Sequence, residues 1–95
     1  MGCDVMVNLL DNKYEIIRGK ENFDSETVKS FFTDYFLPFD YILGDYAYDK
    51  LRLKGFYDSN NKKVKDFNNI NNLDDYIKKY CAYGARIFVL KKLKK

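Results

Sequence analysis

The segment LRLKGFY, residues 51–57, is the stretch of sequence that decides the fold class. Its side chains alternate between two chemistries, as they do on the two faces of an extended strand. One face is apolar and consists of Leu51, Leu53 and Tyr57; the other joins two cations to an aromatic ring and consists of Arg52, Lys54 and Phe56. The alternation predicts a half-buried β-strand.

The segments around this strand predict further strands. Residues 39–48 are rich in Tyr, Phe and Ile, and the short connection through Asp49 and Lys50 predicts a hairpin with 51–57. Gly44 in the middle of the first strand indicates a bulge or bend. Residues 85–90 form a nearly continuous apolar run, which predicts a strand buried on both faces.

Two amphipathic helices are predicted, at 25–36 and 73–81. Both have apolar residues at i, i+3, i+4, i+7 and i+8, which is the helical period. Asp24 and Asn72 are suitable N-caps, and Pro38 and Gly84 mark the exits. The two stripes are Val28, Phe31, Phe32, Tyr35 and Phe36 in the first helix, and Leu73, Tyr76, Ile77, Tyr80 and Cys81 in the second.

At the N-terminus, two apolar runs at 5–10 and 14–18 flank Asp11, Asn12 and Lys13, a turn-forming triplet that favours another hairpin. The full element order is (β)-β-α-β-β-α-β, the order of split-βαβ, ferredoxin-like sandwiches. We therefore expect residues 1–95 to form a single α+β domain with one mixed or antiparallel sheet and two packed helices. Residues 1–13 would supply the extra N-terminal strand, and 91–95 a basic tail.

The composition excludes several classes of enzyme. Histidine is absent, so there is no imidazole base and no His-activated nucleophile. There is no glycine-rich phosphate loop, and two cysteines cannot form a four-cysteine metal site. Cys81 lies on an apolar helix stripe and is predicted to be a shielded core residue, whereas Cys3 is incidental.

No cofactor or metal is predicted. Asp45 and Asp49 could meet in a loop, but their spacing matches no calcium loop. An enzyme would have to rely on Asp45 with Arg52 for acid–base or phosphoryl chemistry. The sequence favours a non-enzymatic binding module.

The strand 51–57 carries the first binding hypothesis. Arg52, Lys54 and Phe56 combine phosphate-binding cations with a stacking ring, and residues 61–95 carry a net charge of +7 against −4 for residues 1–60. Such a face would bind RNA or the ribosome. The alternative is that the N-terminal segment covers this face, with Arg52 and Lys54 paired to Asp45 or Asp49.

The second binding hypothesis is a protein partner. It assigns Tyr46, Tyr48, Tyr57 and Tyr83 to an exposed aromatic patch of the kind found at interfaces. No stretch approaches the eighteen apolar residues of a membrane span, and the start of the chain lacks the pattern of a signal peptide. We therefore expect a cytoplasmic protein without a membrane partner.

Several blocks between residues 14 and 90 resemble the bacterial YutD-like family. They are Tyr14-Glu15-Ile16-Ile17, Asp40-Tyr41-Ile42-Leu43-Gly44-Asp45, the LRLKGFY segment, Leu73-Asp74-Asp75-Tyr76 with Tyr80-Cys81, and Phe88-Val89-Leu90. The resemblance implies a single α+β domain of a small cytoplasmic bacterial protein, and it supplies no catalytic residue. The chain departs from the family in having Tyr46 and Ala47 in place of Trp and Gly, and Ala85 in place of a second cysteine. It therefore could not perform chemistry that needs the cysteine pair.

Overall fold

The computed structural model describes residues 6–47, 50–81 and 86–93. Five strands and two α-helices follow the predicted order, and short 3-10 turns join them. The elements are β1 (Met6–Leu9), β2 (Asn12–Arg18), η1 (Lys20–Asn22), α1 (Ser25–Phe31), η2 (Asp34–Phe36), β3 (Tyr41–Ala47), β4 (Lys50–Phe56), η3 (Asp66–Asn68), η4 (Ile70–Asn72), α2 (Leu73–Tyr80) and β5 (Arg86–Lys92). Tyr48, Asp49, Tyr83, Ala85 and Cys3 lie outside the described residues.

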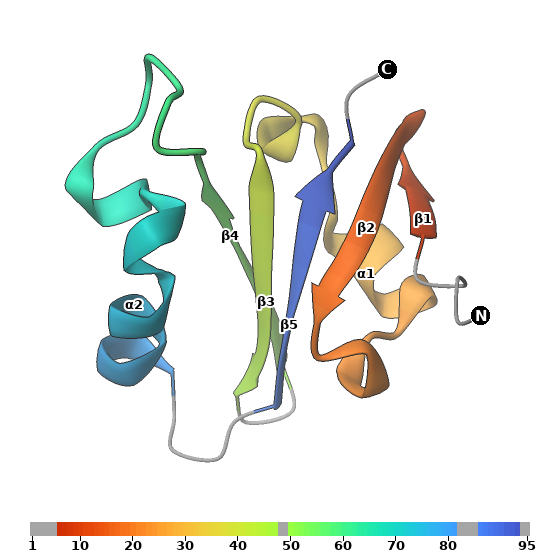
Figure 1. Cartoon of the computed structure of the whole chain (residues 1–95). Helices are drawn as coiled ribbons and strands as arrows, with labels where there is room; N and C mark the ends of the chain where they lie inside the picture. Colours follow the sequence, from red (N-terminus) through yellow and green to blue (C-terminus); the bar gives the residue numbers. More distant parts are fainter. Residues whose placement is uncertain (1–5, 48–49, 82–85, 94–95) are drawn as a thin grey trace.

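The strands form one antiparallel sheet in the order β1-β2-β5-β3-β4 (Figure 1). The last strand of the sequence, β5, lies in the middle of the sheet between β2 and β3. Its residues Phe88, Val89 and Leu90 are almost fully buried, which confirms the prediction of a strand covered on both faces. Lys91 and Lys92, predicted to begin a basic tail, instead complete this strand.

The two helices lie on opposite faces of the sheet (Figure 1). On the α1 side the core is built around Tyr14, Phe32 and Phe88. On the α2 side it is smaller and is built around Leu43, Phe56 and Val89. One antiparallel sheet with two packed helices confirms the predicted α+β class. The likeness to a ferredoxin-like sandwich ends with the element order, because that fold places both helices on one face.

The first helix is shorter than its apolar stripe predicts. The α1 helix ends at Phe31, because Phe32 is extended (φ −82°, ψ 125°) and its buried ring packs edge-on against Tyr14, with ring centroids 5.6 Å apart. This core contact overrides the helical pattern, and Phe31 and Tyr35 are left 51% and 67% exposed. The Asp24 cap is confirmed, since its carboxylate accepts from the backbone N–H of Glu26.

The bulge predicted at Gly44 is wrong, because β3 keeps an unbroken register with both of its neighbours. Glycine is needed there for another reason: a β-carbon would overlap the ring of Phe88. The sheet has its irregularity in β2 instead, where the pairing with β5 shifts between Ile16 and Arg18. The shift brings Arg18 to the α2 side, where it pairs with Asp74 at 2.9 Å.

Tyr14 is a buried tyrosine whose hydroxyl has no hydrogen-bond partner among the described residues. Burial raises its pKa to about 12 from 10.0. The unfolded chain therefore loses this proton at a lower pH than the folded protein does, so stability should fall as the pH rises from 10 to about 12. In Tyr14→Phe this contribution should vanish, and at neutral pH the variant should be at least as stable as the parent. Urea melts across this pH range test the prediction; an unchanged alkaline profile in Tyr14→Phe would contradict it.

Candidate functional site

The face of β4 that carries Arg52, Lys54 and Phe56 lies beneath α2. The three side chains share one face, as the alternation predicts, but α2 covers Phe56 on that face, whereas Arg52 stays exposed. Phe56 is only 1% exposed, and its ring meets Tyr76 of α2 edge-on at 5.4 Å. The expectation of an open stacking ring is therefore corrected: a nucleic-acid base cannot reach Phe56 while α2 is in place. The cover is α2 rather than the N-terminal segment.

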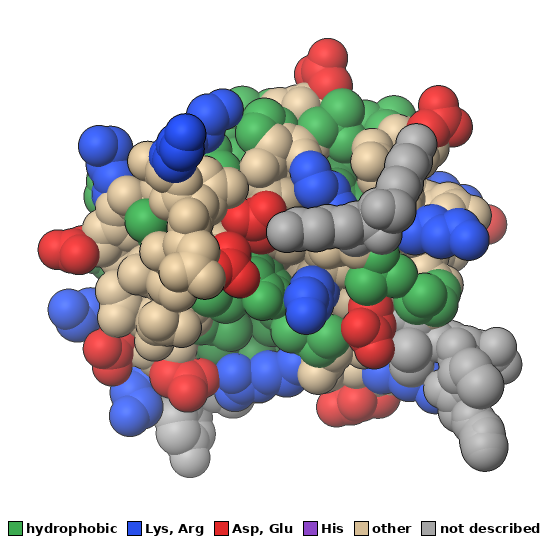
Figure 2. All heavy atoms as spheres, turned by 45° about the horizontal axis from the view of Figure 1, so that its top comes forward, with side chains coloured by type: hydrophobic (Ala, Val, Ile, Leu, Met, Phe, Trp, Pro, Cys, Tyr) green, Lys and Arg blue, Asp and Glu red, His purple; other side chains and the backbone are tan. Residues whose placement is uncertain are grey.

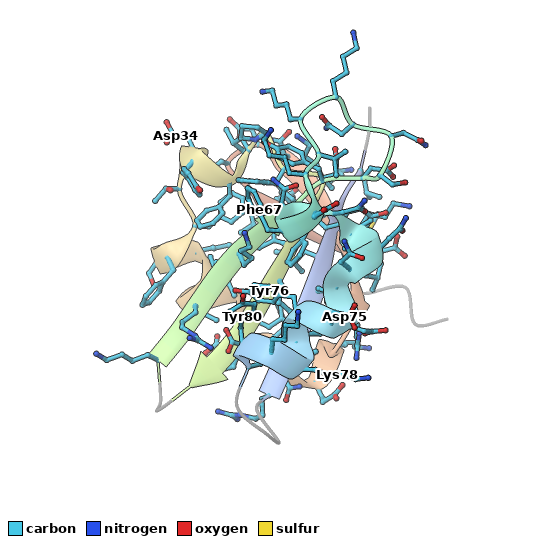
Figure 3. All side chains as sticks on the ribbon, turned by 90° about the vertical axis from the view of Figure 1, so that its left-hand side faces the viewer. Asp34, Phe67, Asp75, Tyr76, Lys78 and Tyr80 are labelled. Atoms are coloured by element: carbon cyan, nitrogen blue, oxygen red, sulfur yellow. The ribbon has the colours of Figure 1, made fainter. Side chains whose placement is uncertain are left out.

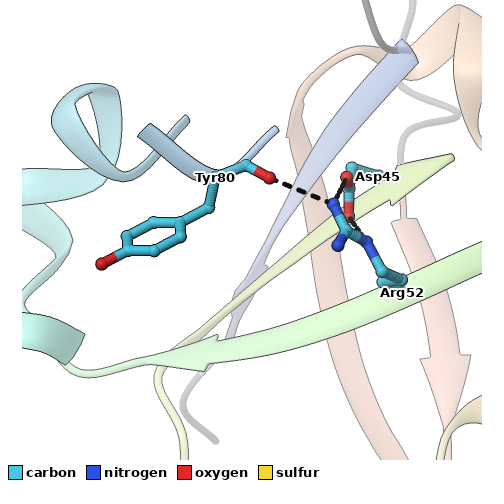
Figure 4. Close-up of polar contacts among 3 residues, drawn as sticks. All are labelled: Asp45, Arg52 and Tyr80. Atoms are coloured by element: carbon cyan, nitrogen blue, oxygen red, sulfur yellow. Dashed lines mark hydrogen bonds and ion pairs between the residues drawn. The ribbon is translucent and has the colours of Figure 1, made fainter. Parts of the chain in front are cut away.

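Arg52 makes the strongest polar contact of this face. It lies directly opposite Asp45 in the β3–β4 pairing, and its guanidinium donates to both carboxylate oxygens, Nη2 to Oδ2 at 2.6 Å and Nε to Oδ1 at 3.3 Å (Figure 4). Nη2 also lies 3.3 Å from the backbone oxygen of Tyr80, the last residue of α2. The Asp45 side chain is 7% exposed and that of Arg52 54%. Arg52 thus neutralises a buried carboxylate and caps the negative end of the helix dipole.

Lys54 lies among aromatic rings rather than carboxylates. Its Nζ is 5.6 Å from the ring centroid of Phe56, 5.4 Å from that of Phe67 and 5.8 Å from that of Tyr76. These are cation–π distances. Partial burial lowers the pKa of Lys54. Within the described residues no carboxylate pairs with this ammonium group, so it remains a partly desolvated, uncompensated charge.

Beside these cations runs a row of aromatic side chains from η3 and α2 (Figure 3). Phe67 is 66% exposed and Tyr80 62%, and Tyr76 stacks on Tyr80 with centroids 4.8 Å apart. We define the β4–α2 surface as this row together with the cations on the same face of β4: Lys50, Arg52, Lys54, Phe67, Tyr76 and Tyr80. Sequence reasoning missed Phe67, although a lone phenylalanine in a polar, lysine-rich loop was a signal for it.

Of the four tyrosines predicted to form an exposed interaction patch, the two that the structure describes, Tyr46 and Tyr57, are at least partly buried. Tyr57 is 8% exposed and stacks on Phe39 with centroids 4.7 Å apart. Tyr46 is half-buried beneath the guanidinium of Arg86, on the opposite sheet face from α2. The remaining two, Tyr48 and Tyr83, lie outside the described residues.

Cys81 follows α2 and packs against the core on that side. Burial is the main cause that raises the pKa of the Cys81 thiol, and the negative charge of Asp45 raises it further. The reactive thiolate is therefore disfavoured. We expect a thiol reagent at neutral pH to label Cys81 much more slowly in the folded protein than in urea. Peptide mapping of the labelled sites distinguishes it from Cys3. Equally fast labelling in both states would contradict the packing and reopen a nucleophilic role.

The described residues contain no group of three metal-ligating side chains, and Asp45 is bound to Arg52. A polar pocket of about 240 Å³ lies at the end of the sheet where β3 begins. Its Asp40 carboxylate already accepts from the backbone N–H of Asp58 and from Asn61 Nδ2. Figure 2 shows this end obliquely, and the acidic and basic side chains of the described residues are interspersed there. No helix in the described ranges is long and apolar enough to cross a bilayer.

The fold defines a small α+β domain with one helix on each face of an antiparallel sheet, and exposed aromatic rings and cations lie together on its β4–α2 surface. The family model described as "Putative antitoxin YutD-like" matches residues 8–91, so the chain belongs to the YutD-like family. It is 38% identical over 91 residues to "Putative antitoxin YutD" of Bacillus subtilis (strain 168), covering 95% of this chain and all of the relative. The solution NMR structure of yutD from B. subtilis superposes with a TM-score of 0.78 over 97% of this chain and 84% of that one.

Proposed function

We propose that this protein is a binding module that docks a partner protein through the β4–α2 surface. The observation that carries the proposal is the exposure of Phe67 and Tyr80 on the same surface as the half-exposed side chain of Arg52. Aromatic residues and arginine dominate the energetics of protein interfaces. The description of the B. subtilis relative, "Putative antitoxin YutD", is consistent with a protein partner.

RNA or the ribosome is the other candidate partner, through Arg52, Lys54 and Phe56. The contacts of these residues favour a protein instead. Phe56 is buried beneath α2, so the ring that this hypothesis assigns to base stacking is not accessible.

Site-specific photocrosslinking in the native cell tests the proposal. A photoreactive amino acid at position 80 should capture one protein, and the same group at Ile17, which is 47% exposed on β2, should not. With the captured protein purified, we expect Phe67→Ala and Tyr80→Ala each to weaken binding about tenfold or more, and Ile17→Ala less than about twofold. Titration calorimetry gives these ratios.

Three results would count against a protein partner at this surface. The first is crosslinking from position 80 to RNA, accompanied by a steep loss of affinity as salt is raised. The second is equal capture from position 17. The third is a captured protein whose affinity is unchanged by both aromatic substitutions.

A further inference from the structure

We infer that the β4–α2 surface takes an extended acidic segment of the partner, with carboxylates at alternate residues. This inference rests on the proposed function and adds the chemistry of the partner. It is carried by the arrangement of three cations on β4 and by the unpaired charge of Lys54.

The cations lie in a row along the strand. Lys50, Arg52 and Lys54 share one face at two-residue spacing. A strand rises about 3.3 Å per residue, so neighbouring cations repeat at roughly 6.5 Å. A partner segment in the extended conformation repeats its own side chains on one side at the same distance. Acidic residues at i, i+2 and i+4 would therefore match the row in register, whereas the 5.4 Å pitch of a helix would not.

Each cation of the row retains capacity for a carboxylate. Lys50 is exposed, and within the described residues Lys54 has ring contacts but no carboxylate within salt-bridge distance. Arg52 uses Nε and Nη2 for its contacts with Asp45 and Tyr80, and Nη1 makes no hydrogen bond to the described residues. Lys54 has the most to gain, because its ammonium has lost part of its hydration without gaining an opposite charge.

The aromatic row strengthens such ion pairs. Phe67 and Tyr76 flank the ammonium of Lys54, and the ring of Tyr80 lies against that of Tyr76. A bound segment would lie against these rings, which would exclude water from one side of the charge pairs. Lower local polarity makes each pair stronger than at an open surface.

Selection from a random dodecapeptide library displayed on phage tests the inference with the whole chain as bait at about 0.15 M salt. We expect enrichment of peptides with Asp or Glu at i and i+2. The double variant Lys50→Glu with Lys54→Glu should reverse the preference towards Lys and Arg. The matched control is Lys13→Glu with Lys91→Glu, which makes the same charge change on exposed positions of β2 and β5 and should leave the preference acidic.

A selected peptide should bind the Lys54→Met variant about tenfold or more weakly than it binds the parent protein. Lys54→Met keeps the apolar contacts of the side chain, so it serves as the test if the double variant fails to fold. Peptides that need Phe67 and Tyr80 but show no acidic preference would overturn the inference and leave the proposed function standing. Retained affinity in Lys54→Met would also overturn it. Failure of every peptide to depend on Phe67 or Tyr80, together with no protein crosslinked from position 80, would overturn the proposed function itself. Displacement of the peptides by a uridine oligonucleotide at matched salt would assign the cation row to phosphates.

Discussion

Phe32→Ala is expected to lower the free energy of unfolding by about 3–5 kcal/mol, the usual cost of emptying a buried phenylalanine site. Phe32 is 5% exposed, and its ring contacts Tyr14 and Phe36 with centroids 5.6 and 5.5 Å away. Backbone atoms of β2 and of the segment after α1 hold those neighbours in place, so the cavity cannot collapse fully. Urea denaturation followed by circular dichroism measures the loss.

The adjacent residue provides the control for this prediction. Phe31 belongs to the same predicted stripe but is 51% exposed, so Phe31→Ala should cost less than about 1 kcal/mol. Equal losses for the two variants would mean that the helix continues through Phe32 and that the break after Phe31 is wrong.

Arg52→Leu is expected to destabilise the protein by about 2–3 kcal/mol. The substitution leaves the buried Asp45 carboxylate without its cation and frees the carbonyl of Tyr80 at the end of α2. Loss of a fully buried partner costs about 3–5 kcal/mol, and we reduce this because the Arg52 side chain is 54% exposed. Arg18→Leu breaks a surface pair with Asp74, whose side chains are 49% and 77% exposed, and should cost less than about 1 kcal/mol.

A double-mutant cycle locates the cause of the Arg52 effect. In an Asp45→Asn background the buried charge is gone, so Arg52→Leu should cost clearly less than in the parent protein. Thermal and urea melts of the four proteins measure the coupling. Additive losses would show that Arg52 acts through its packing on α2 and not through Asp45.

Much of the fold could be predicted because its signals are local. The alternation of 51–57 placed Arg52, Lys54 and Phe56 on one face, and the apolar run at 85–90 identified a strand covered on both sides. Helix ends were less predictable. The apolar period continues through Phe32, but a long-range contact with Tyr14 determines the backbone conformation at that residue. The local sequence pattern does not predict this contact.

The candidate site was predicted in part for the same reason. Pairing of Arg52 with Asp45 follows from a hairpin, in which opposite residues are fixed by a short turn. Placement of α2 over Phe56 depends on elements about twenty residues apart and on which sheet face each helix takes. The polar loop around Phe67 was a signal for that residue, but its place beside Lys54 depends on this long-range packing and not on its neighbours in sequence.

The position of β5 affects how the chain folds. The final strand separates β2 from β3, so the hairpins β1–β2 and β3–β4 have no hydrogen-bonded contact with each other in the sheet until β5 is inserted. During synthesis both hairpins emerge first, each with an unpaired edge that is a template for association with other chains. We therefore expect chains that end before Arg86 to aggregate rather than to fold as smaller domains. The sheet cannot be completed before β5 has been synthesised. Because β5 pairs with strands that are distant in the sequence, we expect this step to be slow.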